Sequence, residues 1–204
     1  MIENLISFSI ASIILALSPG PDNLYVIAQS LANGTKSGVA TTLGLVSGCI
    51  VHTTLLAFGV SAIISASDTL FYGLKVIGAL YLLYLAFKVF KSDAHVDLKE
   101  KATKKSYLKL FKQGVVMNLV NPKILIFFLA FFPGFLWNES QNTISQFYIL
   151  GILFMIISFI IFSSLAILAG YISSTLNKNK SISVLLKWLQ IIVFVGIAVF
   201  ILIP

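Results

Sequence analysis

The sequence predicts an all-α integral membrane protein in which six transmembrane helices form two inverted three-helix repeats, with the first and fourth helices interrupted. Three observations support this prediction. Of the 204 residues, 58% are hydrophobic and 10% are charged, and the mean hydropathy is +1.01, whereas soluble domains are about a quarter charged. Six windows are apolar over about 20 residues, which is long enough to cross a bilayer. Prolines fall inside two of these windows, where they interrupt a helix.

The apolar windows follow one another with mostly short connections. The run from Leu5 to Leu17 has only Glu3 as a charged residue before it, whereas a signal peptide begins with basic residues, so we interpret the run as part of a span. Little more than Ser67 and Asp68 separates the second window from the third. The predicted spans are 5–31, 39–66, 69–90, 114–136, 145–172 and 183–203.

These spans predict one membrane transporter domain over residues 1–204. Residues 1–90 form the first repeat, 91–113 a lysine-rich cytoplasmic loop, and 114–204 the second repeat. Because each half holds an odd number of spans, the second half runs opposite to the first. Transporters commonly have this symmetry, with the binding site near the membrane midplane where the repeats meet.

The lysines predict the orientation. The net charge of +7 could suggest nucleic-acid binding, but the lysines lie in short connections beside apolar spans, where they set topology. Since such loops stay in the cytoplasm, both termini are expected outside. The lysine-bearing connections hold Lys36, Lys88 through Lys112, and Lys178, Lys180 and Lys187, whereas the opposite side holds Glu3, Asp68 and Glu139, with Lys75 as an exception.

The first motif interrupts the first span. Pro19 and Pro21 lack amide donors, and Gly20 loosens the backbone between them, so a continuous helix here is disfavoured. A new helix is expected to begin near Pro21. Asp22 and Asn23 follow in its first turn, where the helix dipole favours a carboxylate.

The second motif, Asn121-Pro122-Lys123, interrupts the fourth span in the same way. Asn121 is a candidate N-cap and Pro122 the first helical residue. In the predicted topology the two restarted helices begin near the membrane interior with their partially positive ends converging, which suits a carboxylate ligand. Lys123 would add a positive charge and Asp22 would receive an amine or a coupling proton, so the site suits a zwitterion such as an amino acid.

Each charged residue also has a structural interpretation. Asp22 could cap its own half-helix, although ionisable residues within spans are functional candidates by default. Lys123 could instead extend to the cytoplasmic interface as an anchor.

The second span has a face of small residues. Gly44, Gly48, His52 and Gly59 recur at helical spacing, and Gly44 to Gly48 is a GxxxG match. We expect this face to pack closely against another helix, with His52 hydrogen-bonded to a neighbouring helix. A pH-sensing or substrate-lining role for His52 is the alternative. The same face makes a homodimer a further expectation.

Catalysis is not expected. Ser47 and His52 lie five residues apart on one helix, which separates their directions by about 140°. His95 is in the lysine-rich loop, and Cys49 is a single cysteine, so no cluster typical of a metal site is present. We therefore expect neither a metal nor a cofactor.

Four segments carry a resemblance to a known family. They are SPGPDNLYV (18–26), SGVATTLGLVSGCIVH (37–52), YLLYLAFK (81–88) and FKQGVVMNLVNPKILIFFLAFFPGF (111–135). With these segments the chain resembles the LysE/RhtB family of amino-acid exporters, of the homoserine, threonine and leucine efflux type.

The resemblance implies six helices in a bacterial inner membrane, export of amino acids from the cytoplasm, and the proton gradient as the driving force. It places the family's PGP motif on Pro19, Gly20 and Pro21 and its NPK motif on Asn121 to Lys123, and the same segment contributes Asn118 to the expected binding residues. Asp22 is a departure, since many members have a neutral residue there.

The resulting hypothesis is export of small neutral or hydroxylated amino acids by alternating access, coupled to proton entry. Two alternatives remain. One is an exporter of metal ions or other small solutes within the wider superfamily. The other is a membrane scaffold that transports nothing, held together by the GxxxG face.

Overall fold

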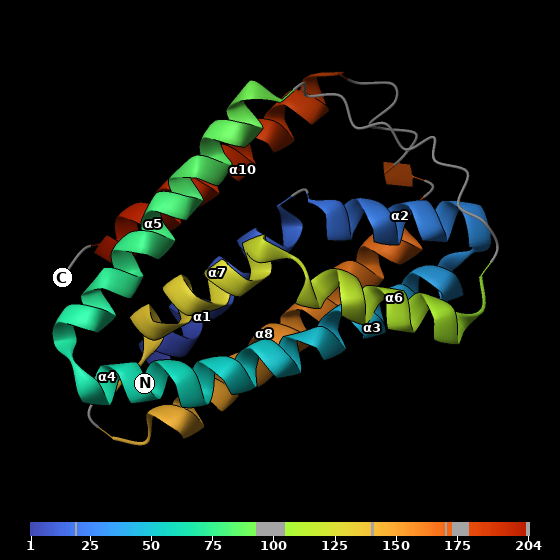
Figure 1. The fold of residues 1–204 in the computed structure, drawn as a ribbon. Coiled ribbons are helices and arrows are strands. Elements are labelled where there is room, and N and C mark those ends of the chain that lie inside the picture. Colours follow the sequence, from blue (N-terminus) through green and yellow to red (C-terminus); the bar gives the residue numbers. More distant parts are fainter. Residues whose placement is uncertain (19, 93–104, 140, 170, 173–179, 203–204) are drawn as a thin grey trace.

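The computed structural model describes residues 1–18, 20–92, 105–139, 141–169, 171–172 and 180–202, except the side chains at 65, 68, 123, 180–183 and 186. In these ranges the long elements are helices and none is a strand (Figure 1). The elements are α1 (Ile2–Leu17), α2 (Pro21–Asn33), α3 (Thr35–Leu55), the π-helical turn η1 (Leu56–Val60), α4 (Ser61–Ala66), α5 (Asp68–Lys91), α6 (Tyr107–Leu119), α7 (Pro122–Phe131), the 3₁₀ turn η2 (Phe132–Phe135), α8 (Thr143–Ile167) and α10 (Lys180–Leu202).

The predicted interruptions of the first and fourth spans are confirmed. Helices α1 and α2 meet at an angle of 57°, and α6 meets the α7–η2 segment at 53°. The second helix of each pair begins at a proline, Pro21 or Pro122. Proline suits this position because its missing amide would have no partner in the first turn.

Three helical segments are long and apolar enough to cross a membrane by themselves, and the number rises to five if each bent pair forms one span. The sixth predicted span coincides with α10, but the apolar part searched there, Lys187–Leu202, is shorter. The all-helical membrane class therefore agrees with the prediction, while the count of six spans is not confirmed.

Contacts near the termini define one end of the bundle. The Asn4 side chain at the start of α1 donates hydrogen bonds to the carbonyls of Phe135 and Leu136, at 3.4 and 3.3 Å. The Phe135 ring in turn stacks on Phe200 of α10, with ring centroids 5.1 Å apart. The start of α1, the end of η2 and the last turns of α10 therefore lie together.

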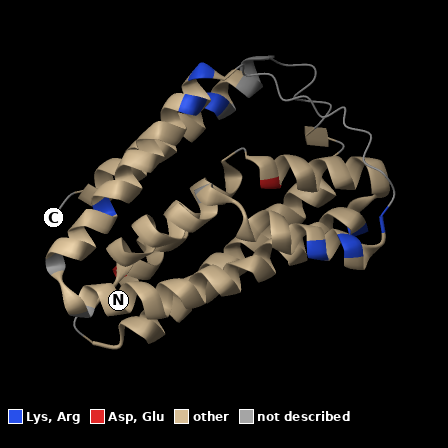
Figure 2. Cartoon of the chain, viewed as in Figure 1, with Lys and Arg blue, Asp and Glu red and all other residues tan. Residues whose placement is uncertain are grey.

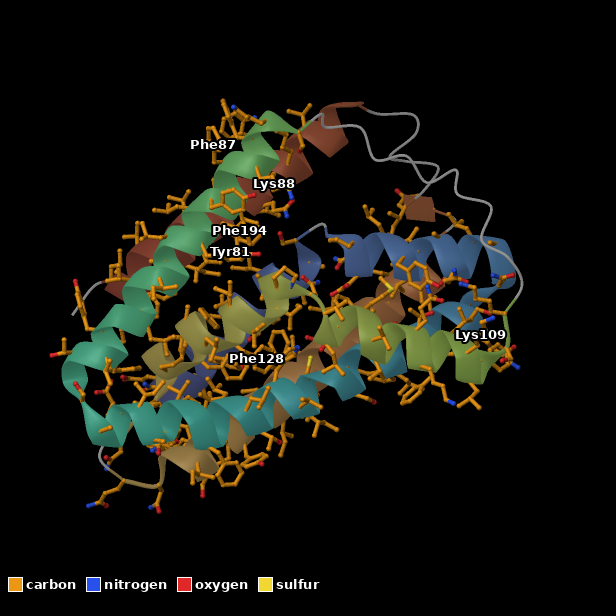
Figure 3. All side chains as sticks on the ribbon, in the orientation of Figure 1. Tyr81, Phe87, Lys88, Lys109, Phe128 and Phe194 are labelled. Carbon is orange, nitrogen blue, oxygen red and sulfur yellow. The ribbon has the colours of Figure 1, made fainter. Side chains whose placement is uncertain are left out.

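Most of the described lysines lie away from the termini, at the other ends of the helices (Figure 2). Lys88 near the end of α5 and Lys109 in the first turn of α6 are examples (Figure 3). Lys187 of α10 donates a 2.7 Å hydrogen bond to the carbonyl of Ser92, just after α5. Lys75 is the exception that the sequence also gives, because it lies in the first half of α5.

One boundary differs from the prediction. Helix α6 begins at Tyr107, inside the stretch 91–113 that we expected to be a loop. The Ser106 side chain accepts a hydrogen bond from the amide of Lys109 at 3.4 Å, and such an N-cap stabilises a helix start. The charged residues that led us to place this segment outside the span therefore lie in a helix that extends beyond the apolar window.

The glycine face of α3 packs against α6, as predicted for two of its three glycines. A Cβ on Gly44 would lie 2.0 Å from the backbone oxygen of Phe111, and one on Gly48 would lie 2.6 Å from Oδ1 of Asn118. Because α6 of the same chain occupies this face, the face is not available to a second copy. The glycines therefore do not support a homodimer.

The prediction for Gly59 was wrong. This glycine is exposed, and within the described part of the chain a Cβ there would meet no atom within 4 Å. The reason is that Gly59 lies within the π-helical turn η1. A π-helical turn is wider than an α-helical one and shifts the register of the helix, so Gly59 leaves the face that Gly44 and Gly48 share.

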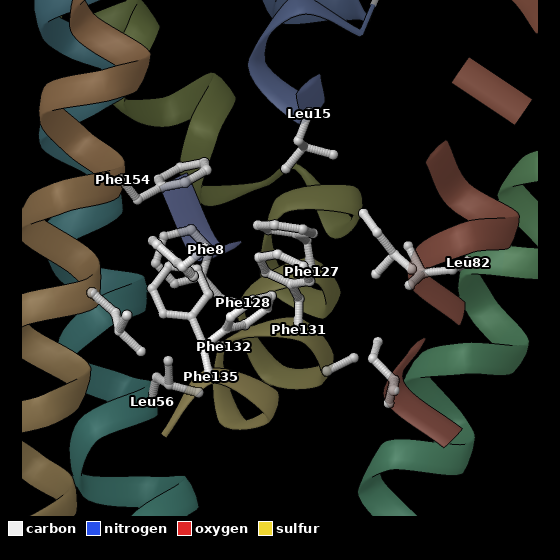
Figure 4. Close-up of a cluster of buried hydrophobic side chains, with 14 of the residues drawn as sticks. Phe8, Leu15, Leu56, Leu82, Phe127, Phe128, Phe131, Phe132, Phe135 and Phe154 are labelled. Atoms are coloured by element: carbon white, nitrogen blue, oxygen red, sulfur yellow. The ribbon is translucent and has the colours of Figure 1, made fainter. Parts of the chain in front are cut away.

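A cluster of buried phenylalanines fills the bundle between the helix breaks and the end near the termini (Figure 4). The rings of Phe127 and Phe131 stack at 4.4 Å between centroids, and those of Phe128 and Phe132 stack at 4.2 Å. The cluster comprises Phe8 of α1, Phe127, Phe128 and Phe131 of α7, Phe132 and Phe135 of η2, and Phe154 of α8.

Candidate functional site

The first helix break places a carboxylate inside the bundle. Gly20 is extended, with φ −161° and ψ 174°, and precedes Pro21 as the N-cap of α2. The amide of Leu24 donates to the Gly20 carbonyl at 3.0 Å and closes the first turn. Asp22 therefore lies in that turn, as predicted, with only 6% of its surface exposed.

Asn23 provides hydrogen-bond donors for carbonyls at the end of α1. Its side-chain amide donates to the carbonyls of Ala16, at 2.8 Å, and Ser18, at 3.4 Å. A break leaves carbonyls without helical partners, and inside a membrane these need a donor from the protein. The Asn23 amide group, which we expected to contact a substrate, thus stabilises the interruption itself.

The second break is built around Asn118 and Asn121. The amide of Asn121 donates to the Asn118 carbonyl at 3.1 Å, which closes the turn at the end of α6. The Asn121 carbonyl then accepts from Ile124 and Leu125 at 3.1 and 3.2 Å. It therefore begins the hydrogen-bond ladder of α7, as an N-cap residue does.

The two breaks meet. The Asn121 side-chain amide donates to the two carboxylate oxygens of Asp22, at 3.4 and 3.3 Å. From this point α2 runs toward the lysine-bearing end and α7 toward the phenylalanine cluster (Figure 1). The partially positive N-termini of two helices are therefore close together and oriented in opposite directions.

A cavity of about 40 Å³ lies at the meeting point. Its polar wall includes Ser18, Asp22, Asn118, Asn121 and Ser158, and its apolar wall includes Leu15, Leu45, Ile124, Phe127, Phe154 and Phe162. Backbone and side chains from both broken spans, α3 and α8 thus surround one small space.

Three residues that line the cavity each have a buried polar atom without a hydrogen-bond partner among the described residues. The atoms are Oγ of Ser18, Oγ of Ser158 and Oδ1 of Asn118. Buried polar groups normally have partners. These three residues beside the cavity are therefore exceptions to that rule.

The structure brings most of the predicted binding residues together. Gly20, Pro21, Asp22, Asn23, Asn118 and Asn121 all line the cavity. Pro122 begins α7 directly beside it. Pro19 and the side chain of Lys123 lie outside the described part of the structure.

Sequence reasoning missed Cys49, Ser158, Phe127 and Phe154 as cavity residues. Ser158 is a small polar residue within the strongly apolar helix α8 and is buried, so its isolation was an available signal. Phe127 and Phe154 gave no signal, because a phenylalanine in a membrane span predicts only packing or lipid contact. Among the described residues, no group of three or more His, Cys, Asp or Glu side chains is placed to hold a metal ion.

His52 makes the predicted hydrogen bond to a neighbouring helix. It is 3% exposed, and its Nε2 lies 3.2 Å from the carbonyl oxygen of Asn118. Asn118 also donates from its side-chain amide to Sγ of Cys49, at 3.5 Å. Helix α3 therefore contacts the second break at two neighbouring points.

The chain is similar to known efflux proteins over most of its length. It is 30% identical over 181 residues to the homoserine/homoserine lactone efflux protein of Salmonella typhimurium, a match that covers 89% of this chain and 87% of that protein. It is also 30% identical over 201 residues to the leucine efflux protein of Enterobacter sp. strain 638, covering 96% of this chain and 93% of that protein.

No solved structure matches the chain. The family model described as LysE type translocator matches residues 13–204, which include both helix breaks and the cavity between them. The match extends over far more than half of the sequence and agrees with the resemblance carried by the two proline motifs. The chain therefore belongs to the LysE type translocator family.

Proposed function

We propose that this translocator exports small neutral or hydroxylated amino acids from the cytoplasm by alternating access, driven by the proton gradient. The family match and the two relatives, named for efflux of homoserine, homoserine lactone and leucine, support the class of substrate. The observation that carries the proposal is the contact between Asp22 and Asn121 at the meeting point of two helix N-termini.

This geometry suits a zwitterion. The first amides of α2 and α7 give partial positive charge where a substrate carboxylate would bind. The Asp22 carboxylate accepts hydrogen bonds and attracts an ammonium group. Lys123, the second residue of α7, would add a full positive charge on the carboxylate side. The apolar wall is left for the side chain of the substrate, as in most small-molecule sites.

Alternating access is supported by the arrangement of the two broken spans around the cavity. The phenylalanine cluster packs between the cavity and the end near the termini, so release on that side requires these rings to move. The two bent pairs run in opposite directions, which supports an inverted repeat in which each can move in turn.

We assign the lysine-bearing end to the cytoplasm and both termini to the outside of a bacterial inner membrane. The distribution of lysine in Figure 2 supports this orientation because short lysine-rich connections remain cytoplasmic. In that orientation the phenylalanine cluster lies on the outer side of the cavity. That side is then the exit for an exported substrate.

We assign the coupling proton to Asp22. A carboxylate buried inside a membrane protein is costly unless it has a function or a partner. Protonation of Asp22 would remove the charge that holds the substrate ammonium group, so a proton entering from outside would release the substrate there. Deprotonation toward the cytoplasm would restore binding.

Efflux from cells loaded with dipeptides tests the proposal, since internal hydrolysis raises the concentration of a chosen amino acid. We expect faster efflux of leucine, threonine or homoserine with the wild-type chain and loss of that difference with Asp22→Asn. Ser164→Ala is the matched control, because Ser164 is exposed on α8 and its hydroxyl donates a hydrogen bond to the carbonyl of Ile160 in its own helix. Equal efflux with and without the wild-type chain for every amino acid would refute the proposal. Faster efflux of a metal ion in its place would indicate a metal-ion exporter.

A further inference from the structure

The second helix break is attached to an uninterrupted helix through His52. The partner of His52 is the carbonyl oxygen of Asn118, and a carbonyl oxygen only accepts hydrogen bonds. The Nε2 atom of His52 therefore carries the proton and donates it. The other ring nitrogen, Nδ1, is buried and has no hydrogen-bond partner within the described residues.

The Asn118 carbonyl is also the acceptor that closes the break. It receives the amide of Asn121 at 3.1 Å and Nε2 of His52 at 3.2 Å. One oxygen thus fixes the turn between α6 and α7 and attaches that turn to α3. Three residues after Asn118, the Asn121 side chain reaches the carboxylate of Asp22. An unbroken series of hydrogen bonds and one tight turn therefore connects His52 to the ionisable residue of the cavity.

The sequence of α3 makes this attachment close. Gly48 leaves the space that Asn118 fills, because a Cβ there would lie 2.6 Å from Asn118 Oδ1. Cys49 accepts a second hydrogen bond from the Asn118 side chain. Helix α3 has no break from Thr35 to Leu55. It therefore offers a rigid surface against which the broken span can be held.

We propose that His52 is a positioning residue that holds the break between α6 and α7 so that Asn121 faces Asp22. His52 does not line the cavity, so it acts through Asn118 and Asn121 and does not touch the substrate. This inference rests on the proposed function, because it assigns to His52 a role in the transport site.

Two substitutions of His52 test where the hydrogen-bond donor must lie, because both keep a polar side chain. The side-chain nitrogen of Gln corresponds to Nε2 of histidine, whereas that of Asn ends nearer the backbone, as Nδ1 does. We expect His52→Gln to keep the apparent KM for efflux within about twofold of the wild type. His52→Asn should raise that KM about three- to tenfold, the range that loss of one hydrogen bond gives. The amount of protein in the membrane is measured for each variant.

A purely structural role would lower the amount of folded protein and the maximal rate without changing KM. Should His52→Asn fail to accumulate, His52→Phe replaces it, because a Phe ring keeps the contact with Phe128, whose ring centroid lies 5.6 Å from that of His52, and still lacks the donor. The KM of this variant should rise by the same factor.

A double-mutant cycle with Asn121→Ala tests the connection. If His52 acts through Asn121, the double variant should raise KM by less than the product of the two single factors. Independent, multiplicative factors would overturn the inference, as would an unchanged KM in both His52→Asn and His52→Phe. If wild-type efflux is normal and Asp22→Asn abolishes it, a negative result for His52 leaves the proposed function unaffected. Absence of wild-type efflux overturns the proposed function and this inference together.

Discussion

Substitution of Gly44 by alanine should separate α3 from α6. The new Cβ would lie 2.0 Å from the carbonyl oxygen of Phe111, whereas ordinary contact begins at 3.4 Å. The obstacle is backbone, so no side-chain rotation relieves it, and the two helices must shift relative to each other. Overpacking of this kind costs about 1–3 kcal/mol, which for a chain of this size lowers the apparent Tm on the order of 5 °C.

Thermal unfolding of the purified protein in detergent, followed by size-exclusion chromatography, measures this shift. Gly73→Ala is the matched control, because Gly73 lies within α5 and a Cβ there meets no described atom within 4 Å. Alanine favours helix by about 1 kcal/mol over glycine, so the control should be unchanged or more stable. Equal Tm values for Gly44→Ala and Gly73→Ala would refute the close packing of α3 and α6.

Three further predictions concern the site. Asn23→Ala should lower the free energy of unfolding by about 1–3 kcal/mol, because the carbonyls of Ala16 and Ser18 lose their donor; a larger loss of transport than of folded protein would instead indicate a direct role in binding. Phe127→Leu should shift efflux toward amino acids with larger side chains, because it removes ring volume from the apolar wall; competition between threonine and leucine in loaded cells measures the ratio, and an unchanged ratio would exclude Phe127 from selectivity. A protonophore should abolish efflux against a concentration gradient while leaving efflux down the gradient through the wild-type chain measurable. Export against the gradient that persists would exclude proton coupling.

The proline motifs predicted the helix breaks and the residues around them, because the physics of proline and of helix N-termini is local. Gly20, Asp22, Asn118 and Asn121 were expected to belong to one site and do line one cavity. The hydrogen bond between Asp22 and Asn121 was not predicted, since two residues 99 positions apart are brought together only by the packing of both broken spans.

Tertiary packing decided the features that the sequence could not predict. Gly59 has the helical spacing of Gly44 and Gly48, yet it lies within a π-helical turn and faces another direction. The start of α6 was not predicted because it lies among charged residues. Hydropathy detects the apolar part of a helix and not the polar turns that extend it. Phe154 contributes to the cavity wall from α8, a helix with apolar residues on all sides in which Ser158, one turn further on, is the signal for the face that points inward.

The aromatic rings between the cavity and the termini have a consequence for energy conservation in the cell. Proton conduction needs a file of water or exchangeable hydrogen-bonding groups, and the stacked rings of Phe127, Phe128, Phe131 and Phe132 offer neither. Under the proposed proton coupling, a carrier at rest with this apolar barrier would not let protons leak through it. Phenylalanine rings have no polar groups to pair, so they can separate without breaking a hydrogen bond or ion pair when substrate leaves.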